Sequence, residues 1–247
     1  MKAAVYSGTR NLYEAMSTAA KSLLFHSSVD KIYFLIEDDE FPEKLPSNIE
    51  TINVSDQTYF PRNSANFKSP FSYMALLRVC YTKLFPDVDK ILQLDVDTVV
   101  VDNIDELWDI DLTDKYFAAV EEYLSTWKPY YKKYYNIGVA MFNLDELRKD
   151  HKDDLMIDFL NRVTTPYIDQ DACNRYLIRK CVDMPVRFNE TVVTGFTDSP
   201  AIVHFAGFKE WETNPRVSRR EYLKKYRNMT WKEALSHGKS SNRSSDI

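Results

Sequence analysis

The fold of this 247-residue chain is decided by the stretch Lys90-Ile91-Leu92-Gln93-Leu94-Asp95-Val96-Asp97-Thr98-Val99-Val100-Val101. A short apolar run leads into two carboxylates and a β-branched run follows them, which indicates a buried strand that ends in a metal site. Two carboxylates one residue apart repel each other and are costly to remove from water without a cation. A hard divalent ion relieves this cost, and an ion held by few carboxylates usually has phosphate oxygens as its other ligands. The alternative is an exposed acidic turn between two strands, because D-x-D is a short and common pattern.

Strands and helices alternate along the rest of the chain. Besides the run that begins at residue 90, apolar runs predict strands at residues 2–6, 31–37, 49–54, 117–120, 137–143 and 202–205. Helical spacing predicts helices at residues 13–25, 73–85, 104–108, 144–163, 169–180 and 219–237. This alternation predicts an α/β fold with a Rossmann-like, mostly parallel central sheet and helices on both faces. Ligands of such sheets bind beyond the carboxyl ends of the strands, where residues 7–11 and 95–97 both fall.

The charge distribution divides the chain into two parts. We expect one domain over residues 1–215, followed by a basic C-terminal helix and a flexible tail over residues 216–247. Residues 216–247 carry nine Lys/Arg and three Asp/Glu, a net charge of +6, while the remaining residues carry 23 and 34, a net charge of −11. A basic tail on an acidic body suggests an anionic partner such as a membrane surface. The alternative is a solvated basic helix with a disordered end. No nucleic-acid partner is expected.

The cysteines and the hydropathy pattern bear on the compartment. Cys80, Cys173 and Cys181 are an odd number without C-x-x-C spacing, which suggests a reducing compartment and no structural zinc. Three buried small hydrophobic residues are the alternative. We recognise neither a signal peptide nor a run of transmembrane length. The expectation is therefore a cytoplasmic protein, which lies at the inner face of the membrane if its basic tail binds there.

A second element supports the metal site. In the stretch Val203-His204-Phe205-Ala206-Gly207-Phe208-Lys209, a histidine follows an apolar run. A neutral imidazole adds a nitrogen ligand to two carboxylates, which suits Mn²⁺ better than Mg²⁺. The chain has only five glycines and no Gly-rich phosphate loop, so phosphate must be held by metal, Lys/Arg and helix ends. Gly207 would let the backbone approach a diphosphate, and Lys209 would neutralise its charge. Taken alone, His204 could also be a hydrogen-bonded core histidine.

Two further polar elements are candidates for substrate contacts. Asp169-Gln170-Asp171 lies at the start of a predicted helix, where acidic residues are favoured for structural reasons alone. Gln170 is the less expected member, and its amide could hydrogen-bond a substrate hydroxyl. Asn136 precedes an apolar strand, and an ordinary turn asparagine is the alternative there.

Together these residues resemble glycosyltransferase family 8, which includes bacterial lipopolysaccharide galactosyl- and glucosyltransferases and glycogenin. The resemblance runs from Met1 to about Trp211. It is strongest in FSYMALLR (residues 71–78), DKILQLDVD (89–97) and LWDIDL (107–112), whose order and spacing are more specific than any single motif. The resemblance implies a GT-A fold, a nucleotide-sugar donor that is usually UDP-linked, and retention of the anomeric configuration.

The resemblance also implies the metal and donor contacts. Asp95, Asp97 and His204 match the manganese ligands of the family. The remaining donor-binding positions are spread over the chain. They are Tyr6, Ser7, Thr9, Asn11 and Tyr13 at the end of the first strand, where the uridine is held, and Arg78, Val96, Gly207 and Lys209 nearer the phosphates. Lys209 lies one residue closer to the histidine than in relatives.

The same comparison assigns residues to the sugar. Asn136, Asp169 and Gln170 match residues near the transferred sugar and are the predicted catalytic group. Glu121 lies where relatives have an acidic residue facing the sugar or the acceptor.

The chain is therefore expected to be an Mn²⁺-dependent, retaining transferase that moves glucose or galactose from a UDP-sugar to a glycan, glycolipid or glycoprotein acceptor. One alternative is a haloacid-dehalogenase-like phosphatase, whose D-x-D-x-[TV] motif also follows an apolar strand. That motif normally lies near the N-terminus, and His204 and Gly207 would then have no role. The other alternative is a non-catalytic nucleotide-sugar binding protein, against which the intact metal ligands argue.

Overall fold

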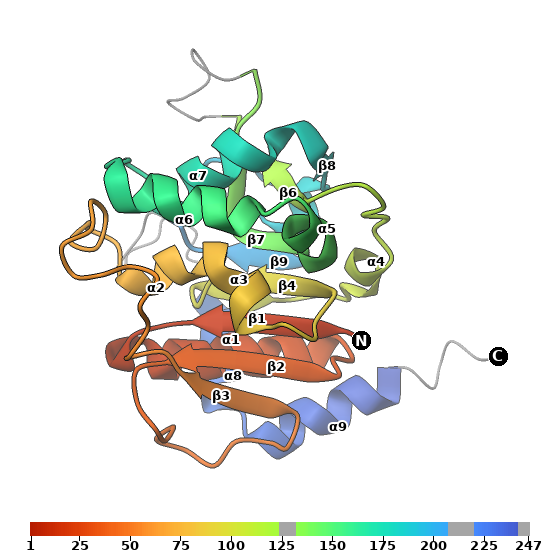
Figure 1. The fold of residues 1–247 in the computed structure, drawn as a ribbon. Helices are drawn as coiled ribbons and strands as arrows, with labels where there is room; N and C mark the ends of the chain where they lie inside the picture. Colours follow the sequence, from red (N-terminus) through yellow and green to blue (C-terminus); the bar gives the residue numbers. More distant parts are fainter. Residues whose placement is uncertain (124–131, 207–219, 242–247) are drawn as a thin grey trace.

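The central feature of the computed structural model is a seven-stranded sheet (Figure 1). The structure describes residues 1–123, 132–206 and 220–241. A separate two-stranded ladder joins β5 (Thr98–Val100) to β9 (Ile202–His204). The order of the strands in the large sheet is β3 (Ile49–Asn53), β2 (Lys31–Ile36), β1 (Ala3–Ser7), β4 (Lys90–Leu94), β7 (Tyr135–Asn143), β6 (Phe117–Glu121) and β8 (Cys181–Asp183).

Most neighbouring strands of this sheet are parallel. β1 pairs in parallel with β2 and β4, β2 with β3, and β6 with β8, whereas β7 runs antiparallel to both β4 and β6. The predicted mostly parallel α/β fold is therefore confirmed. Because Val5 lies opposite Gln93 in the parallel β1–β4 ladder, the chain leaves both strands at the same edge of the sheet. This edge carries the D-x-D motif, as expected for a ligand site in an open α/β sheet.

Helices cover both faces of the sheet. Side chains of β1 alternate between the faces, with Ala3 and Val5 in one hydrophobic core and Ala4 and Tyr6 in the other. The second core is covered by α1 (Tyr13–His26) and α4 (Asp105–Trp108). The first core is covered by α2 (Tyr73–Leu76), α3 (Tyr81–Leu84), α5 (Leu144–Lys149), α6 (Lys152–Arg162) and α7 (Ile168–Leu177).

Several predicted helices are interrupted in the structure. The helix predicted at residues 73–85 consists of α2, a 3₁₀ turn (Leu77–Cys80) and α3. The helix predicted at residues 144–163 is split into α5 and α6 at His151, whose φ of 48° is left-handed and incompatible with a continuous helix. The helix predicted at residues 169–180 tightens into a 3₁₀ turn over its last residues (Ile178–Lys180) and leads into β8, a strand that was not predicted.

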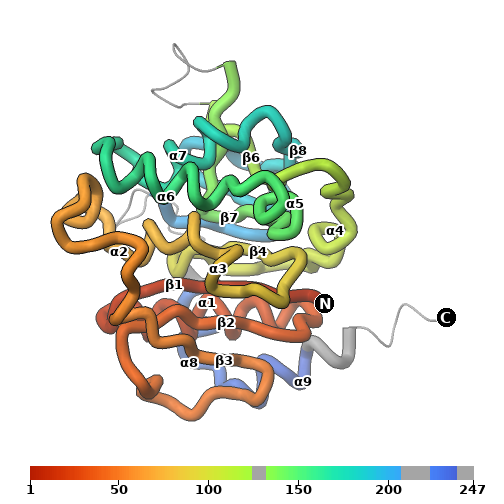
Figure 2. Tube along the Cα trace, viewed as in Figure 1, coloured from red at the N-terminus to blue at the C-terminus, as the bar shows by residue number. Residues whose placement is uncertain are grey.

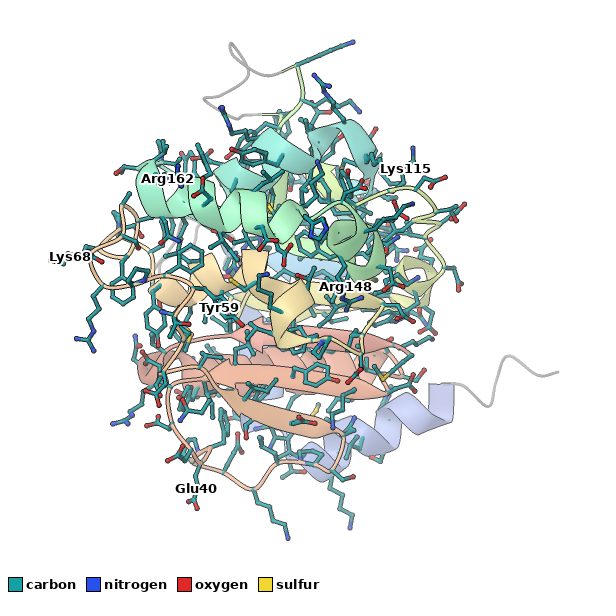
Figure 3. The ribbon with its side chains drawn as sticks, viewed as in Figure 1. Glu40, Tyr59, Lys68, Lys115, Arg148 and Arg162 are labelled. Carbon is teal, nitrogen blue, oxygen red and sulfur yellow. The ribbon has the colours of Figure 1, made fainter. Side chains whose placement is uncertain are left out.

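Arg148 on α5 anchors the helical layer to the start of β4 (Figure 3). Its guanidinium donates hydrogen bonds to the carbonyl oxygens of Phe85 and Val88 at 2.7 and 2.6 Å. These carbonyls lie in the turn before β4, where the Phe85 carbonyl oxygen also accepts from the Val88 N–H at 3.2 Å. The arginine thereby fixes the strand that delivers the D-x-D motif.

The predicted C-terminal helix is in fact two helices, α8 (Arg220–Asn228) and α9 (Trp231–Ser241). The break is a capping box, because the Glu233 N–H donates to Thr230 Oγ1 at 3.3 Å and the Thr230 N–H donates to the Glu233 carboxylate at 2.8 Å. Both helices contact α1, so the C-terminal helices in blue lie beside the N-terminal segments in red (Figure 2). No helix within the described ranges is long and apolar enough to cross a membrane.

His26 is a titratable contact between α1 and α8. Its Nε2 lies 2.6 Å from the hydroxyl oxygen of Tyr226, a buried residue of α8. Burial, together with the positive charge of Lys225, lowers the pKa of His26 from 6.5 to about 4. As the pH falls, His26 is therefore protonated in the unfolded chain at a higher pH than in the folded chain. The free energy of unfolding is expected to decrease between pH 6.5 and pH 4 for this reason.

Replacing His26 by glutamine (H26Q) should remove this part of the pH dependence, because an amide keeps a hydrogen bond to Tyr226 but does not titrate. Urea unfolding measured from pH 7 to pH 4 gives the comparison, and the slope against pH should differ from that of the wild type by up to about one proton. H151N removes an exposed histidine and should keep the wild-type slope. A wild-type slope in H26Q would contradict the assignment.

Candidate functional site

Asp95, Asp97 and His204 come together at the edge of the sheet where β4 ends. The antiparallel pairing of β5 with β9 puts Thr98 opposite His204, which brings the histidine back to the D-x-D turn. His204 Nε2 lies 3.5 Å from Asp95 Oδ2 and 3.3 Å from Asp97 Oδ1. The ligand atoms of the three residues lie within 4.8 Å of one another. Two carboxylate oxygens and an imidazole nitrogen at this spacing are a donor set that fits one divalent metal ion.

The backbone holds the two aspartates in a tight turn. The N–H and the hydroxyl of Thr98 both donate to the Asp95 carbonyl oxygen, at 3.1 and 2.7 Å. On the other side, the Phe205 N–H donates to the Asp97 carbonyl oxygen at 2.9 Å. The main-chain groups of the motif are thus occupied, and the carboxylates are left to serve as ligands.

Gly138 on β7 makes room for the metal cluster. Its carbonyl oxygen accepts from the Asp95 N–H at 2.7 Å. A Cβ atom at this position would overlap the His204 ring and lie 2.8 Å from Asp95 Oδ2. Since atoms at these separations cannot coexist without movement, only glycine lets the strand pass this close to the ligands.

The electrostatics of the cluster also favour a cation. Burial lowers the pKa of His204, but the charges and hydrogen bonds of Asp97 and Asp95 outweigh burial and raise the pKa to about 10. Burial likewise opposes ionisation of Asp97, yet His204 and Arg78 hold the pKa of that carboxyl below its ordinary value. Both pKa shifts arise from the attraction between the negative carboxylates and a positive charge at His204 Nε2.

Arg78 joins the metal cluster to Asp169. Its guanidinium forms ion pairs with Asp95 and, at 3.0 Å, with Asp169. Burial lowers the pKa of Arg78, but the two carboxylates outweigh burial and keep it above its ordinary value. Burial raises the pKa of Asp169 to about 6 in spite of Arg78. Arg78 lies in the 3₁₀ turn between α2 and α3, and a tightened turn inside a helix often marks a functional position.

The amides of Asn136 and Gln170 converge on a buried carboxylate. Asn136 Nδ2 and Gln170 Nε2 donate to Glu122 Oε1 at 2.8 and 3.0 Å. Glu122 was not predicted from the sequence; the preceding residue, Glu121, was predicted to face the sugar or the acceptor, and this remains a prediction.

The residues predicted to hold the base lie around the end of β1. Tyr6 is fully buried, and its hydroxyl has no hydrogen-bond partner among the described residues; Ser7 beside it is also buried. Thr9 donates to Asn11 Oδ1 at 2.6 Å in the exposed turn that follows.

Two other predicted donor residues are described, and two are not. Tyr13 is buried against Phe41, and its hydroxyl donates to Asp38 at 2.9 Å. Val96 lies beside Gly8, which brings the first turn next to the D-x-D motif. Gly207 and Lys209 lie outside the described residues.

Comparison with known proteins identifies the family. The sequence model described as Glycosyl transferase family 8 matches residues 4–214. The chain belongs to glycosyltransferase family 8. Membership in this family supports glycosyl transfer and gives no support to the phosphatase alternative.

Three curated relatives of this family 8 chain are bacterial proteins that are 25–29% identical to it. Glycosyltransferase GlyA of Streptococcus pneumoniae is 25% identical over 94% of the chain and 35% of its own length. A putative glycosyltransferase of Haemophilus influenzae is 29% identical over 51% of the chain and 42% of its own length. General stress protein A of Bacillus subtilis is 27% identical over 74% of the chain and 73% of its own length. The chain thus spans only about a third to two fifths of the first two relatives.

Solved structures support the GT-A fold. The glycosyltransferase GlyE of Streptococcus pneumoniae superposes with a TM-score of 0.72 at 21% identity, covering 98% of the chain and 64% of GlyE. The galactosyltransferase LgtC, crystallised with donor and acceptor sugar analogues, superposes with a TM-score of 0.70 at 20% identity, covering 94% of the chain and all of LgtC. The GT-A fold expected for this family 8 chain is confirmed.

Four residues of the site were not predicted from the sequence, namely Gln93, Glu122, Gly138 and Asn189. Gln93 is fully buried, donates to Asp95 Oδ1 at 3.0 Å and accepts from Tyr81. A polar residue inside the apolar run of β4 was a usable signal for it. Gly138 and Asn189 had no comparable signal, because their importance depends on contacts between distant segments.

Replacing Gly138 by alanine (G138A) tests the spacing of the cluster. The added methyl group must displace His204 or Asp95, so divalent metal binding is expected to weaken by about tenfold or more. Overpacking should also lower the free energy of unfolding by about 1–3 kcal/mol. Calorimetric titration with Mn²⁺ measures the first effect. A140G removes one carbon from a buried position of the same strand and should keep the wild-type affinity. Unchanged Mn²⁺ affinity in G138A would show that the ligands tolerate the extra atom.

Proposed function

We propose that this chain is a retaining, Mn²⁺-dependent hexosyltransferase that moves glucose or galactose from a UDP-sugar to a glycan, glycolipid or glycoprotein acceptor. The observation that carries the proposal is the convergence of Asp95, Asp97 and His204 within 4.8 Å, directly beside the Arg78–Asp169 ion pair. The three metal-binding side chains suit a metal ion with its bound diphosphate, and the Arg78–Asp169 ion pair suits a sugar beside it. LgtC, which shares the fold, is a galactosyltransferase crystallised with donor and acceptor sugar analogues.

In this proposal the metal cluster holds the leaving group. Asp95, Asp97 and His204 would bind Mn²⁺, or Mg²⁺ as the alternative. A divalent ion, when bound, would neutralise the negative charge that develops on the departing diphosphate. Arg78 pairs with Asp95 and orients it, and Gly207 and Lys209 would contact the diphosphate. The base would lie at the end of β1, held by Tyr6, Ser7, Thr9, Asn11 and Tyr13 and next to Val96.

The sugar lies on the side of Asn136, Asp169 and Gln170. Asp169 would accept hydrogen bonds from sugar hydroxyls while Arg78 holds its carboxylate, and the two amides would position the ring from the other side. In the step that retains configuration, the acceptor oxygen attacks the anomeric carbon on the face that the diphosphate leaves. The bond from that carbon to the diphosphate oxygen breaks, and this oxygen takes the proton of the acceptor hydroxyl. The reacting carbon passes through an oxocarbenium-like state, as in glycoside hydrolysis.

Replacing Asp97 by asparagine (D97N) should lower Mn²⁺-dependent release of UDP from UDP-glucose or UDP-galactose by about 100-fold or more, because a neutral amide is a much poorer ligand for a hard cation. Release of UDP with and without an acceptor sugar is the measurement. D109N makes the same change at an exposed aspartate outside the site and should release UDP at the wild-type rate. Release of UDP by D97N at a near-normal rate would contradict the assignment of Asp97 as a metal ligand. Binding of UDP-sugars by the wild type without any turnover would favour the non-catalytic alternative.

The C-terminal helices are proposed to contact an anionic membrane, which would place a cytoplasmic enzyme at its inner face. Exposed basic side chains gather on α8 and α9, namely Lys224, Lys225, Arg227 and Lys232. The same helices bury Leu223, Tyr226 and Ala234 against the body, so deleting them would expose apolar surface. Charge reversal is therefore a cleaner test than truncation.

The double variant K224E/K232E should bind vesicles rich in phosphatidylserine about tenfold or more weakly than the wild type, since each basic residue near such a surface contributes about 1 kcal/mol. Co-sedimentation at low and high salt is the measurement. K68E/K115E reverses two exposed lysines elsewhere on the surface and should bind like the wild type (Figure 3). Equal binding by K224E/K232E and the wild type would reject the membrane contact.

A further inference from the structure

A continuous set of side-chain hydrogen bonds runs from His204 to Gln170. His204 Nδ1 lies 2.8 Å from Asn189 Oδ1, and Asn189 Nδ2 lies 2.8 Å from Asn136 Oδ1. Asn136 Nδ2 and Gln170 Nε2 then meet at Glu122 Oε1. Asn189 is fully buried, and His204, Asn136 and Glu122 are each no more than 6% exposed. Water therefore cannot replace a lost bond in this set at low cost.

The direction of these bonds is fixed by two backbone N–H groups, which can only donate. The Gly138 N–H donates to Asn136 Oδ1 at 3.0 Å, and the Ile137 N–H donates to Gln170 Oε1 at 3.3 Å. These contacts identify the oxygen of each amide, so the amide nitrogens of Asn136 and Gln170 face Glu122. Asn136 Oδ1 is then an acceptor toward Asn189, which must present its nitrogen there.

The oxygen atom of the Asn189 side-chain amide determines the tautomer of His204. With its nitrogen toward Asn136, Asn189 presents Oδ1 to His204 Nδ1, which must carry a proton to make the bond. In a neutral imidazole this leaves the lone pair on Nε2, the atom that lies 3.5 and 3.3 Å from Asp95 and Asp97. Histidines that bind metals are commonly held in this way through their second nitrogen.

We propose that Asn189 is a positioning residue that aligns the metal site with the sugar-binding amides. Its Oδ1 holds the metal-binding tautomer of His204, and its Nδ2 holds Asn136 against Glu122. The backbone keeps Asn189 in place, because its N–H donates to the Val186 carbonyl oxygen at 3.0 Å and the next residue bridges to β9. The inference rests on the proposed function, since it takes His204 as a metal ligand and Asn136 as a sugar contact.

The two roles of Asn189 can be separated by substitution. N189D keeps an oxygen acceptor for His204 Nδ1 but turns a second oxygen toward Asn136 Oδ1, where a donor is required. N189L removes both hydrogen bonds. Metal binding should therefore survive in N189D and weaken in N189L, whereas the sugar side should be impaired in both.

Mn²⁺ binding is measured by electron paramagnetic resonance titration without nucleotide, and kcat and KM are measured for UDP release from UDP-glucose and UDP-galactose. The expected Mn²⁺ Kd is within about threefold of the wild type for N189D and about 10–100-fold weaker for N189L. The expected kcat of N189D is about 10–100-fold lower. N189S replaces N189L in this comparison if the leucine variant does not fold.

N143D is a matched control, because Asn143 at the other end of β7 also accepts through Oδ1, from the Glu146 N–H, and donates through Nδ2, to the Leu112 carbonyl oxygen. It should change neither Mn²⁺ affinity nor kcat. Wild-type turnover in N189D, or wild-type Mn²⁺ affinity in N189L and N189S, would overturn the role of Asn189 and leave the proposed function standing. A wild-type protein that binds no Mn²⁺ and releases no UDP would instead reject the proposed function, and the role of Asn189 with it.

Discussion

The repulsion between Asp95 and Asp97 is the constraint on which the rest of the site depends. Two carboxylates one residue apart are stable at a partly buried strand end only where positive charge compensates them. Arg78 supplies that charge at Asp95, and His204 supplies it at both aspartates. A proton on His204 Nε2 and a divalent ion meet the same electrostatic demand, which explains why the raised pKa of this histidine and a metal-binding donor set occur together.

The requirement for positive charge beside Asp95 and Asp97 affects parts of the fold that are far from the motif in sequence. His204 reaches the aspartates because β9 pairs with β5, and that ladder is continued by the bridge from Glu190 to Val203. Arg78 reaches them from a 3₁₀ turn between two short helices rather than from a regular helix. β7 can pass behind the cluster only because residue 138 is glycine. Segments separated by more than a hundred residues are thus held together by one local concentration of negative charge.

The sequence was most informative where the signal was local or belonged to the family. The D-x-D strand, the mostly parallel sheet and the grouping of Asp95, Asp97 and His204 were predicted, because apolar runs and motif order are visible without coordinates. The capping box at Thr230 was visible too, yet the break between α8 and α9 was missed. Glu122 was not predicted, because its contacts with Asn136 and Gln170 join segments that are distant in the sequence. Asn189 carries no signal for this role, since its side-chain partners, Asn136 and His204, come from two distant segments.

The arrangement of polar groups also separates two kinds of recognition within a few ångströms. In the proposed function the diphosphate lies beside the charged groups, because the leaving group is an anion whose charge increases during transfer. On the sugar side the amides of Asn136 and Gln170 are oriented by backbone N–H groups and by Glu122. A sugar presents hydroxyls that both donate and accept, so selectivity there depends on which atom each amide presents. Glu122 is therefore best understood as the acceptor that keeps both amide nitrogens turned toward itself. Asn136 Oδ1 already accepts from the Gly138 N–H and from Asn189 Nδ2, so in the proposed function the second lone pair of Gln170 Oε1 is the feature that a substrate hydroxyl would read.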